Sequence, residues 1–462
     1  MAYNVVKFGG SNLKNPSGIK RILKSIVCYE KPLIVVVSAF FGVTNNLLNA
    51  IKLCCRTEFD IESFIDEIKQ QKLDSVKNIV SNPFLLDEFL ENLNQRLSEL
   101  YKLLSMVKQN KTSELHLYDL ILSYGERLSS LVLVYALKDI KYECYEAFPE
   151  DIGLITDGEF KNATVNFELS RELLNTNLSE EKTYIIPGFY GVSQNGCINL
   201  LGRGGSDYSA AAIAACLNAQ SLDLWKDVKG FLSADPNIIP DAVSIQSLTY
   251  AEAAELAYFG SKILHPRTPE PLIEKQIPIR ILNINDLSTN ISPLTIINTK
   301  EVYAHNVIKS VSYNHNFGIL KLVGSGVGIK PGILAKTTSE IDKAGINIKS
   351  VITSQTAINI LLSQDDLMRA KRIVQELNIQ GINSINICDD ISLVAAVGEG
   401  LTSRHGIAGR LFSAVAQKGI NVRIICFGAS NVAMYFIVHK NDCNETIRAI
   451  HSEFFVPQEC LV

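Results

Sequence analysis

Short apolar runs, each followed by a polar loop and a stretch of helical periodicity, organise the first three hundred residues. Apolar runs at residues 4–8, 32–37, 184–188 and 222–225 each predict a buried β-strand. Strands that alternate with helices are typical of an α/β fold with an open, mostly parallel sheet. Ligands of such sheets bind beyond the carboxyl ends of the strands, so we expect the functional residues in these loops.

Residues 60–110 differ from this pattern because they are charged and follow the helical period. Segments such as Ile61-Glu-Ser-Phe-Ile-Asp-Glu-Ile-Lys69 predict a helical insertion in the α/β domain. We interpret its charges as a solvated face rather than a binding surface.

From about Val311 the chain carries an internal repeat. Gly328-Ile-Lys-Pro-Gly-Ile-Leu-Ala-Lys336 has a counterpart in Arg404-His-Gly-Ile-Ala-Gly-Arg-Leu-Phe412. Each contains a glycine turn and leads into an amphipathic helix, a Gly-Ile-Asn sequence and a predicted strand, at residues 351–362 and 424–438. The pattern predicts two ferredoxin-like βαββαβ modules. They could be regulatory, with a ligand at the turn glycines, or could serve dimerisation only.

A six-residue run, Gly202-Arg-Gly-Gly-Ser-Asp207, places a cation, a hydroxyl and an anion on a glycine-rich backbone. A helix predicted to begin near Ser206 would direct its free N–H groups and positive dipole end at a bound anion. The alternative is a tight structural turn whose charges have no function.

A second glycine cluster, Lys7-Phe-Gly-Gly-Ser11, follows the first strand. It is not a Walker A loop, since the lysine precedes the glycines, but an ammonium group beside two backbone amides suits a phosphate. A third loop follows residues 32–37 and runs from Ser38 to Asn45, with Thr44 as an expected helix N-cap.

The composition is that of a folded globular protein, and it excludes several classes of function. In 462 residues, 47% are hydrophobic and 20% charged, and the formal net charge is −4, so nothing indicates nucleic-acid or membrane binding. The ten cysteines form no Cys-x-x-Cys pair, which favours reduced residues in a cytoplasmic protein over a redox pair. The strand near Met1 leaves no room for a leader segment, and the seven histidines have no metal-ligand spacing.

Six motifs follow one another along the chain: Lys7-Phe-Gly-Gly-Ser11, Ser38-Ala followed by Gly42-Val-Thr-Asn45, Ser123-Tyr-Gly-Glu-Arg127, Gly202–Asp207, Trp225-Lys-Asp-Val-Lys-Gly230 followed by Ala234-Asp-Pro236, and Ala257–Arg267. In these motifs and their order the chain resembles aspartate kinase, over essentially its whole length. The repeats resemble the paired ACT domains of that family. The resemblance implies an amino-acid kinase domain over 1–300 and ACT domains over 311–385 and 386–462, without a homoserine dehydrogenase part.

The same resemblance implies transfer of the ATP γ-phosphoryl group to the side-chain carboxylate of L-aspartate, the first step towards lysine, threonine and methionine. It implies that Asp207 orients Lys7 at the reaction centre, that Arg203 binds the α-carboxylate and Glu126 the α-ammonium, and that hydroxyls assist from Ser38, Thr44 and Ser206. Taken singly, Arg203 could form a surface ion pair, and Glu126 could stabilise a helix start.

On the nucleotide side, the resemblance implies a site for ATP, with Mg²⁺ carried by the nucleotide and no dedicated metal ligands in the protein. Its expected residues are Lys7, Gly9, Gly10, Ser11, Trp225, Lys226, Asp227, Asn237 and Lys262. The sequence departs from the common family form at three positions, Lys226, Leu232 and Asn237, where threonine, tyrosine and arginine are frequent.

In the ACT region the resemblance implies an amino-acid effector site. Its expected residues are Val327, Lys330, Gly332, Ile333, Leu334, Lys349, Ser354 and Gln355. Lys349 and Gln355 stand where lysine-sensitive relatives carry acids, so we expect weakened or altered inhibition by lysine. We also expect a homodimer through the ACT region or a tetramer. Alternatives are a catalytically silent amino-acid sensor and a kinase for another amino-acid carboxylate.

Overall fold

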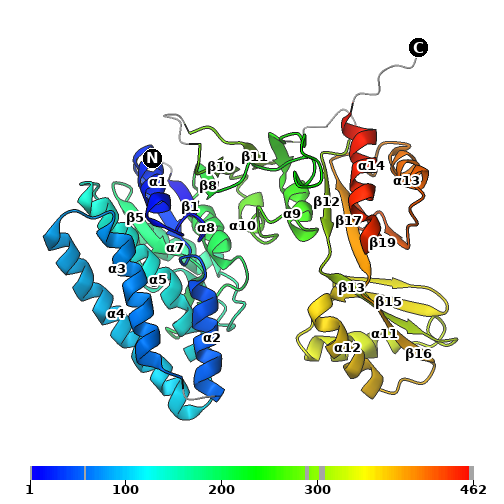
Figure 1. The fold of residues 1–462 in the computed structure, drawn as a ribbon, viewed down its shortest axis with the longest axis horizontal. Coiled ribbons are helices and arrows are strands. Elements are labelled where there is room, and N and C mark those ends of the chain that lie inside the picture. Colours follow the sequence, from blue (N-terminus) through cyan, green and yellow to red (C-terminus); the bar gives the residue numbers. More distant parts are fainter. Residues whose placement is uncertain (1–2, 57–58, 287–290, 301–306, 457–462) are drawn as a thin grey trace. The chain divides into compact units, whose positions relative to one another are not determined.

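The computed structural model describes residues 3–56, 59–286, 291–300 and 307–456 (Figure 1). The chain separates into two compact units. Unit 1 comprises Met1–Phe231, Ser244–Ala257 and Lys262–Val302, and unit 2 comprises Leu232–Val243, Tyr258–Ser261 and Tyr303–Val462. The range 1–300 expected for the kinase domain therefore includes two short segments that pack with unit 2.

Unit 1 is built on a mostly parallel sheet, as the sequence predicts. Its strand order is β3-β5-β2-β1-β8-β10-β11-β9, and the pairs from β3 to β10 are all parallel. The central strands are buried along nearly their whole length because helices cover both faces. The strands are β1 Asn4–Phe8, β2 Leu33–Val37, β3 Tyr145–Glu146, β5 Thr183–Pro187, β8 Ser221–Lys226, β9 Ser247–Thr249, β10 Ile279–Asn283 and β11 Thr295–Asn298.

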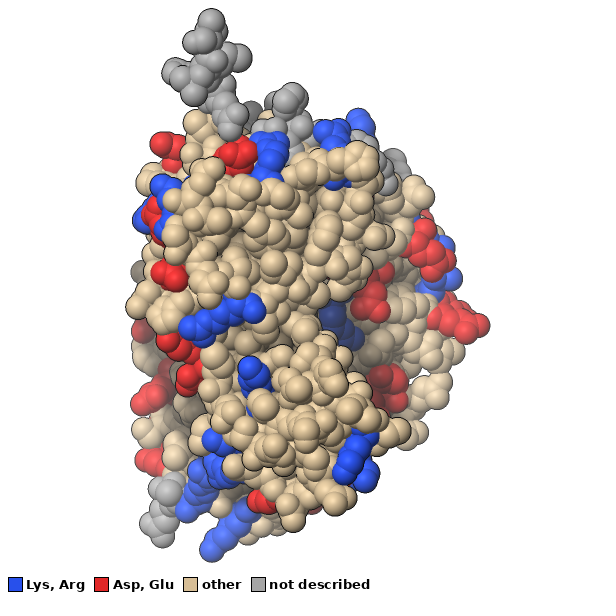
Figure 2. All heavy atoms as spheres, turned by 90° about the vertical axis from the view of Figure 1, so that its right-hand side faces the viewer, with Lys and Arg blue, Asp and Glu red and all other residues tan. Residues whose placement is uncertain are grey.

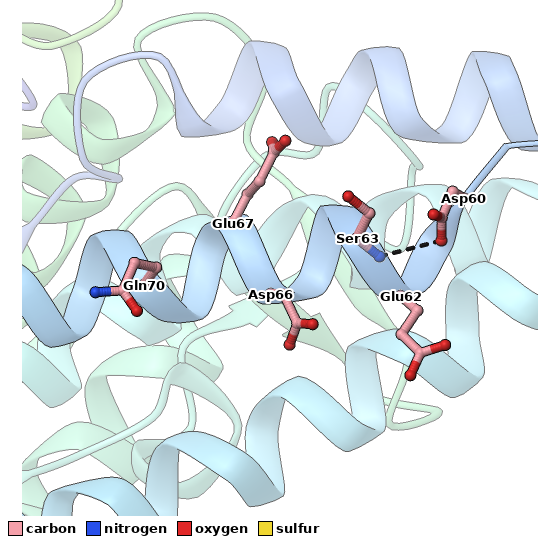
Figure 3. Close-up of a pocket in the computed structure, with 6 residues that line it drawn as sticks. All are labelled: Asp60, Glu62, Ser63, Asp66, Glu67 and Gln70. Carbon is pink, nitrogen blue, oxygen red and sulfur yellow. Dashed lines mark hydrogen bonds between the residues drawn. The ribbon is translucent and has the colours of Figure 1, made fainter.

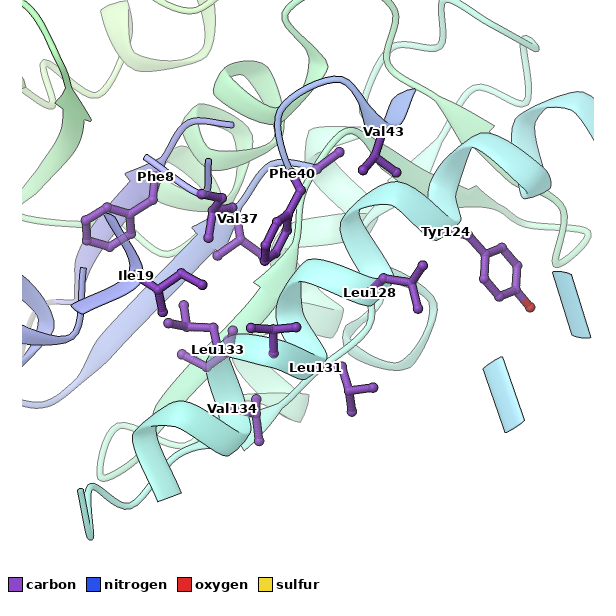
Figure 4. Close-up of a cluster of buried hydrophobic side chains, with 14 of the residues drawn as sticks. Phe8, Ile19, Val37, Phe40, Val43, Tyr124, Leu128, Leu131, Leu133 and Val134 are labelled. Carbon is purple, nitrogen blue, oxygen red and sulfur yellow. The ribbon is translucent and has the colours of Figure 1, made fainter. Parts of the chain in front are cut away.

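The two faces of the sheet pack against different helices. The small-residue helix α8 (Gly205–Cys216) lies on the face to which Lys7 of β1 points, since Asp207 of α8 contacts Lys7. On the opposite face, Phe8 and Trp225 join a large apolar cluster with α1 (Pro16–Val27) and α5 (Leu115–Asp139), shown in Figure 4. Smaller elements complete unit 1: β4 Ile155–Thr156, β6 Tyr190–Ser193, β7 Ile198–Leu200, α2 Val43–Arg56, α6 Pro149–Ile152, α7 Phe167–Asn177, α9 Tyr250–Tyr258 and α10 Glu270–Ile273.

The helical insertion consists of α3 (Ile61–Lys77) and α4 (Pro83–Asn110). Both helices begin at side-chain caps: Asp60 accepts a hydrogen bond from the amide of Ser63, and Asn82 accepts one from the amide of Phe84. Their apolar stripes pack into the same cluster as α5. Helix α5 is long and apolar enough to cross a membrane, but 89% of its most apolar window is buried inside the protein, as expected of a core helix.

Unit 2 contains two sheets of ACT type. In one, β13 (Phe317–Val323), β14 (Ser350–Thr353), β15 (Ala357–Ser363) and β16 (Ser384–Cys388) pair in the order β14-β15-β13-β16, with helices α11 (Ile333–Lys343) and α12 (Gln364–Glu376). The other has the order β12-β17-β19-β18. Its elements are β12 Ser310–Asn314, β17 Ile391–Val397, β18 Ile424–Cys426, β19 Ala433–His439, helices α13 Ile407–Gln417 and α14 Cys443–Phe455, and the 3-10 turn Lys440–Asp442.

Two details of this region differ from the sequence prediction. The single strands predicted at residues 351–362 and 424–438 are each a pair of antiparallel strands, β14–β15 and β18–β19, because a turn interrupts the apolar run. Strand β12 begins at the predicted start of the first ACT domain, yet it pairs with β17 of the second sheet. The first ACT sheet is therefore inserted between two neighbouring strands of the second.

Candidate active site

The predicted site residues of unit 1 gather at the carboxyl ends of the parallel strands. Lys7 lies near the end of β1, Ser38 directly follows β2, and Lys226 is the last residue of β8. Helix α8 begins at Gly205, so its N-terminus lies at the same edge. Exposed N–H groups and the helix dipole make this edge favourable for anions.

Asp207 is held between two lysine ammonium groups. Its Oδ1 lies 2.5 Å from Lys7 Nζ, and its Oδ2 lies 2.9 Å from Lys226 Nζ. Burial raises the pKa of Asp207, but the charges of Lys226 and Lys7 outweigh it and lower this pKa below its ordinary value. Burial lowers the pKa of Lys7, which Asp207 opposes. Two cations and one anion give the cluster a net charge of +1, which suits a polyanionic ligand.

Glu126 lies in the middle of α5 and is buried, so the interpretation as a helix-start carboxylate is wrong. Ser206 Oγ donates a hydrogen bond of 3.4 Å to its Oε1, while its Oε2 is buried without a hydrogen-bond partner among the described residues. Burial raises the pKa of Glu126 to about 8, against the opposing effects of the Ala39 amide and Lys7. A buried carboxylate with an unused oxygen can bind a cation.

Glycines allow close backbone approach between loops and helices at this edge. A Cβ on Gly10 would lie 2.6 Å from the carbonyl oxygen of Ala39, and a Cβ on Gly188 would lie 3.0 Å from Cβ of Ser206. In α5, a Cβ on Gly125 would lie 2.9 Å from Cβ of Ala39. The absence of these side chains lets the loop after β1 and helix α5 approach the loop after β2, and lets the loop after β5 approach α8.

Arg203 and Lys262 are exposed and form no hydrogen bond or ion pair within the ranges that the structure describes. Ser11, after β1, donates a hydrogen bond of 3.2 Å to Asp227, which follows β8. Arg203 lies two residues before α8, so its guanidinium is available to a ligand at the helix start. A planar guanidinium can bind both oxygens of one carboxylate.

Comparison with known proteins agrees with these features. The profile of the amino acid kinase family matches residues 2–283, which is more than half of the chain, and two ACT domain profiles match residues 312–376 and 394–454.

The chain belongs to the amino acid kinase family.

Within this family it stands among the aspartokinases. Aspartokinase 1, chloroplastic, of Arabidopsis thaliana is 31% identical, with 98% of this chain and 80% of that protein aligned. Aspartokinase III of E. coli, solved in complex with aspartate and ADP in the R-state, is 25% identical with a TM-score of 0.82, covering 98% of this chain and all of that one. A second structure of it, with lysine and aspartate in the T-state, has a TM-score of 0.80 at 25% identity, with 98% of this chain and 99% of that one covered.

Three predicted kinase-site residues differ from expectation in their position or their local role. The indole of Trp225 is buried against Phe8 in the apolar cluster and donates a hydrogen bond to the hydroxyl of Tyr29, since its side chain points to the face opposite Lys7. Thr44 is not an N-cap because α2 already begins at Val43. Asn237 belongs to unit 2, where its side chain and backbone amide both donate to Asp235.

The predicted effector residues lie in two neighbouring parts of unit 2. The turn with Val327 and Lys330 leads to Gly332, whose φ of +86° forms the N-terminal boundary of α11, where Ile333 is buried and Leu334 exposed. The amide of Gly328 donates to the carbonyl of Gln355, which joins this turn to the β14–β15 hairpin that also contains Ser354. Lys349 Nζ lies 5.2 Å from the ring centre of Tyr258.

A hollow of about 560 Å³ follows one side of α3 (Figure 3). It is open to solvent and lined by acidic and polar residues: Asp60, Glu62, Ser63, Asp66, Glu67 and Gln70. None of the residues around Asp207 lines it, and its carboxylates would repel a nucleotide or a dicarboxylate. We therefore assign the site to the strand ends and retain the interpretation of these charges as a solvated face.

Two features of unit 1 were not predicted from the sequence pattern. Lys226 was assigned to the nucleotide only, whereas the structure also pairs it with Asp207. The charges of residues 60–110 were interpreted as a solvated face, yet Lys72 of α3 is completely buried. The sequence does contain an indication of this burial, because Lys72 lies four residues after Ile68 on the apolar stripe of α3.

Proposed function

We propose that this protein transfers the γ-phosphoryl group of ATP to the side-chain carboxylate of L-aspartate, forming 4-phospho-L-aspartate, the first step towards lysine, threonine and methionine. One observation supports this most strongly. A buried Lys7–Asp207–Lys226 cluster lies beside the buried Glu126 at the strand ends of a chain related to aspartokinases. The cluster suits phosphates, and Glu126 suits an ammonium group.

The reaction joins two anions, and the chain's residues address that problem. An oxygen of the aspartate side chain forms a bond to the γ-phosphorus while the bond from this phosphorus to the β–γ bridging oxygen breaks. The attacking carboxylate is already ionised at neutral pH, so no general base is required. Lys7 and Lys226 stabilise the charge on the transferred oxygens, and Asp207 fixes their positions.

For the donor, we assign the β- and γ-phosphates to Lys7 and the amides of Gly9 and Gly10. Ser11, Asp227 and Lys262 complete the proposed nucleotide site. No three His, Cys, Asp or Glu side chains in the described ranges converge as a metal site, and both oxygens of Asp207 contact lysines. Mg²⁺ fits here as an ion held mainly by nucleotide oxygens, where it would neutralise phosphate charge.

For the acceptor, we assign the α-carboxylate of aspartate to Arg203 and its α-ammonium to Glu126. Ser38, Thr44 and Ser206 offer hydroxyl groups for the remaining oxygens. A catalytically silent sensor would have no need for the buried lysine pair. A kinase for another amino-acid carboxylate would require a different spacing between the ammonium site and the phosphate site.

Unit 2 supports a homodimer. Strand β18 is an edge of its sheet, and Ile425 within it and Phe427 directly after it are about half exposed. In Figure 2, where this unit faces the viewer, broad areas of the surface carry no charged side chains, and the Lys, Arg, Asp and Glu residues are scattered between them. We propose that the ACT sheets pair between two copies of the chain and that an amino-acid effector binds at the turn before α11.

Hydroxylamine trapping tests the proposed reaction, because it converts an acyl phosphate into a stable hydroxamate. We expect the purified protein with Mg-ATP and L-aspartate to form aspartyl hydroxamate. Asp207→Asn should abolish the signal, whereas Asp87→Asn, at an exposed position of α4, should retain it. A folded wild-type protein that forms no hydroxamate would contradict the proposal and favour the silent sensor.

A further inference from the structure

We infer that Arg267 is a positioning residue of the aspartate site: its guanidinium holds in place the loop 202–204, which carries Arg203, and so fixes where the substrate's α-carboxylate can bind. We call this segment the acceptor loop. The inference rests on the function proposed above, which assigns that carboxylate to Arg203. It adds to the site a residue outside the groups assigned to either substrate.

The Arg203 side chain cannot fix its own position. It is exposed and forms no hydrogen bond or ion pair within the ranges that the structure describes. Its neighbours Gly202 and Gly204 have φ values of +76° and +73°, a conformation that glycine adopts far more readily than other residues. Asp207, by contrast, is held by two lysines. The direction of the Arg203 guanidinium therefore depends on how firmly the backbone of the acceptor loop is held.

Arg267 contacts the chain on both sides of the acceptor loop. Its Nη1 donates a hydrogen bond of 3.4 Å to the carbonyl oxygen of Leu201, directly before the loop. Its guanidinium carbon lies 4.4 Å from the ring centre of Tyr208, which is buried in the first turn of α8. The same group reaches a second segment, since Nη1 donates 3.3 Å to Asn162 Oδ1 and Nη2 donates 3.3 Å to Thr164 Oγ1. One planar cation thus joins three parts of unit 1 around the loop.

Packing confines the acceptor loop at both of its glycines. A Cβ on Gly202 would lie 2.4 Å from Asn162 Oδ1, and a Cβ on Gly204 would lie 2.3 Å from Cγ of His265. The loop backbone therefore lies directly against these two side chains. Arg267 donates a hydrogen bond to Asn162 and stands two residues after His265, so it stabilises both groups that confine the loop. Loss of its guanidinium should let the loop move.

Steady-state kinetics of Arg267→Met test this, with Arg171→Met, at an exposed position of α7, as the matched control. For Arg267→Met we expect KM for aspartate to rise on the order of tenfold, whereas KM for ATP and kcat should stay within about threefold. Arg267→Lys keeps a cation near Tyr208 but lacks the planar fork, so it should recover only part of the loss. Arg171→Met should match the wild type. Reduced stability of Arg267→Met with an unchanged KM for aspartate would overturn the inference and show a purely structural arginine.

A double-mutant cycle tests whether Arg267 acts through Arg203. If it does, Arg267→Met should lower kcat/KM for aspartate in the wild type but change it less than about twofold in the Arg203→Met background. Asn162→Ala, at an exposed position, should show the same pattern with a smaller loss of about threefold, and it serves if Arg267→Met does not fold. Losses that multiply in both backgrounds, in a wild-type enzyme that forms aspartyl hydroxamate, would overturn the inference and leave the proposed reaction intact.

Discussion

At the scale of single residues, replacing Lys226 tests whether its charge acts in catalysis or only in binding and packing. Replacing Lys226 with methionine keeps the Lys7–Asp207 pair but removes one of the two cations at the transferred phosphoryl group. We expect kcat to fall roughly a hundredfold, the range seen when one preorganised charge partner is lost. Steady-state kinetics at saturating aspartate measure this, with the exposed Lys229→Met as control. An unchanged kcat would restrict Lys226 to nucleotide binding or packing.

Glu126 makes stability depend on pH. Its folded-state pKa, about 8, lies above its ordinary value of 4.5, so the protonated group favours folding below about pH 4.5 and loses that contribution as pH rises through 8. Glutamine stays neutral. From pH 5.5 to pH 9, the unfolding free energy of the wild type should therefore fall by at least about 1 kcal/mol more than that of Glu126→Gln. Urea unfolding of both proteins at the two pH values measures this change, and the exposed Glu91→Gln should change with pH as the wild type does. If the unfolding free energies of Glu126→Gln and wild type differ by the same amount at both pH values, the raised pKa of a buried Glu126 carboxyl is contradicted.

The sequence could predict residues that stand in continuous motifs but not residues that meet across the fold. Lys7, Ser206 and Asp207 were predicted from glycine loops at strand ends, and the structure brings them together. Trp225 was misassigned because alternation along β8 does not tell which face of the sheet holds the ligand. Lys72 reaches Phe40 from a distant helix, a contact that depends on tertiary packing.

At the scale of elements, the contact between the loops after β1 and β2 depends on Gly10. A methyl group there would lie 2.6 Å from the Ala39 carbonyl oxygen, whereas one on Gly9 would meet Lys7 Nζ at 3.7 Å. Gly10→Ala should destabilise unit 1 by about 1–3 kcal/mol, the usual cost of overpacking. Gly9→Ala should cost clearly less in the same denaturant titration. If both variants lose the same unfolding free energy, the loops after β1 and β2 can move apart at no cost in stability.

Element type was more predictable from the sequence than strand partnership. The parallel strands and the helices of residues 60–110 follow from hydrophobic period. The pairing of β12 with β17 could not be foreseen, because about 75 residues of the first ACT sheet separate the two strands. The turn within residues 351–362 was missed because Ser354, Gln355 and Thr356 lack the glycine or proline that usually indicates a turn.

At the scale of the whole molecule, we expect association through the edge strand β18. Ile425→Asp would place a charge in the proposed contact and should shift the protein towards monomer in light scattering coupled to size exclusion. Met368→Asp changes an equally exposed apolar residue on α12 and should leave the mass unchanged. A dimer that persists in Ile425→Asp would place the contact elsewhere.

Effector selectivity is the second property of the whole molecule. A lysine cation at position 349 should repel the side chain of a bound lysine, so we expect lysine to inhibit weakly or not at all. Titration of lysine and of threonine into the aspartate phosphorylation assay measures this. Threonine inhibition, or none by either, agrees with the expectation, whereas tight and saturable inhibition by lysine contradicts it.

The most direct test of the central claim is the identity of the acceptor. ADP release should be measured with Mg-ATP and, in turn, L-aspartate, L-glutamate, N-acetyl-L-glutamate and no acceptor. The arrangement of Arg203, Glu126 and the Lys7–Asp207–Lys226 cluster predicts rapid release with L-aspartate and only background release with the others. Equal or faster release with another carboxylate, or background release with all of them, would contradict it.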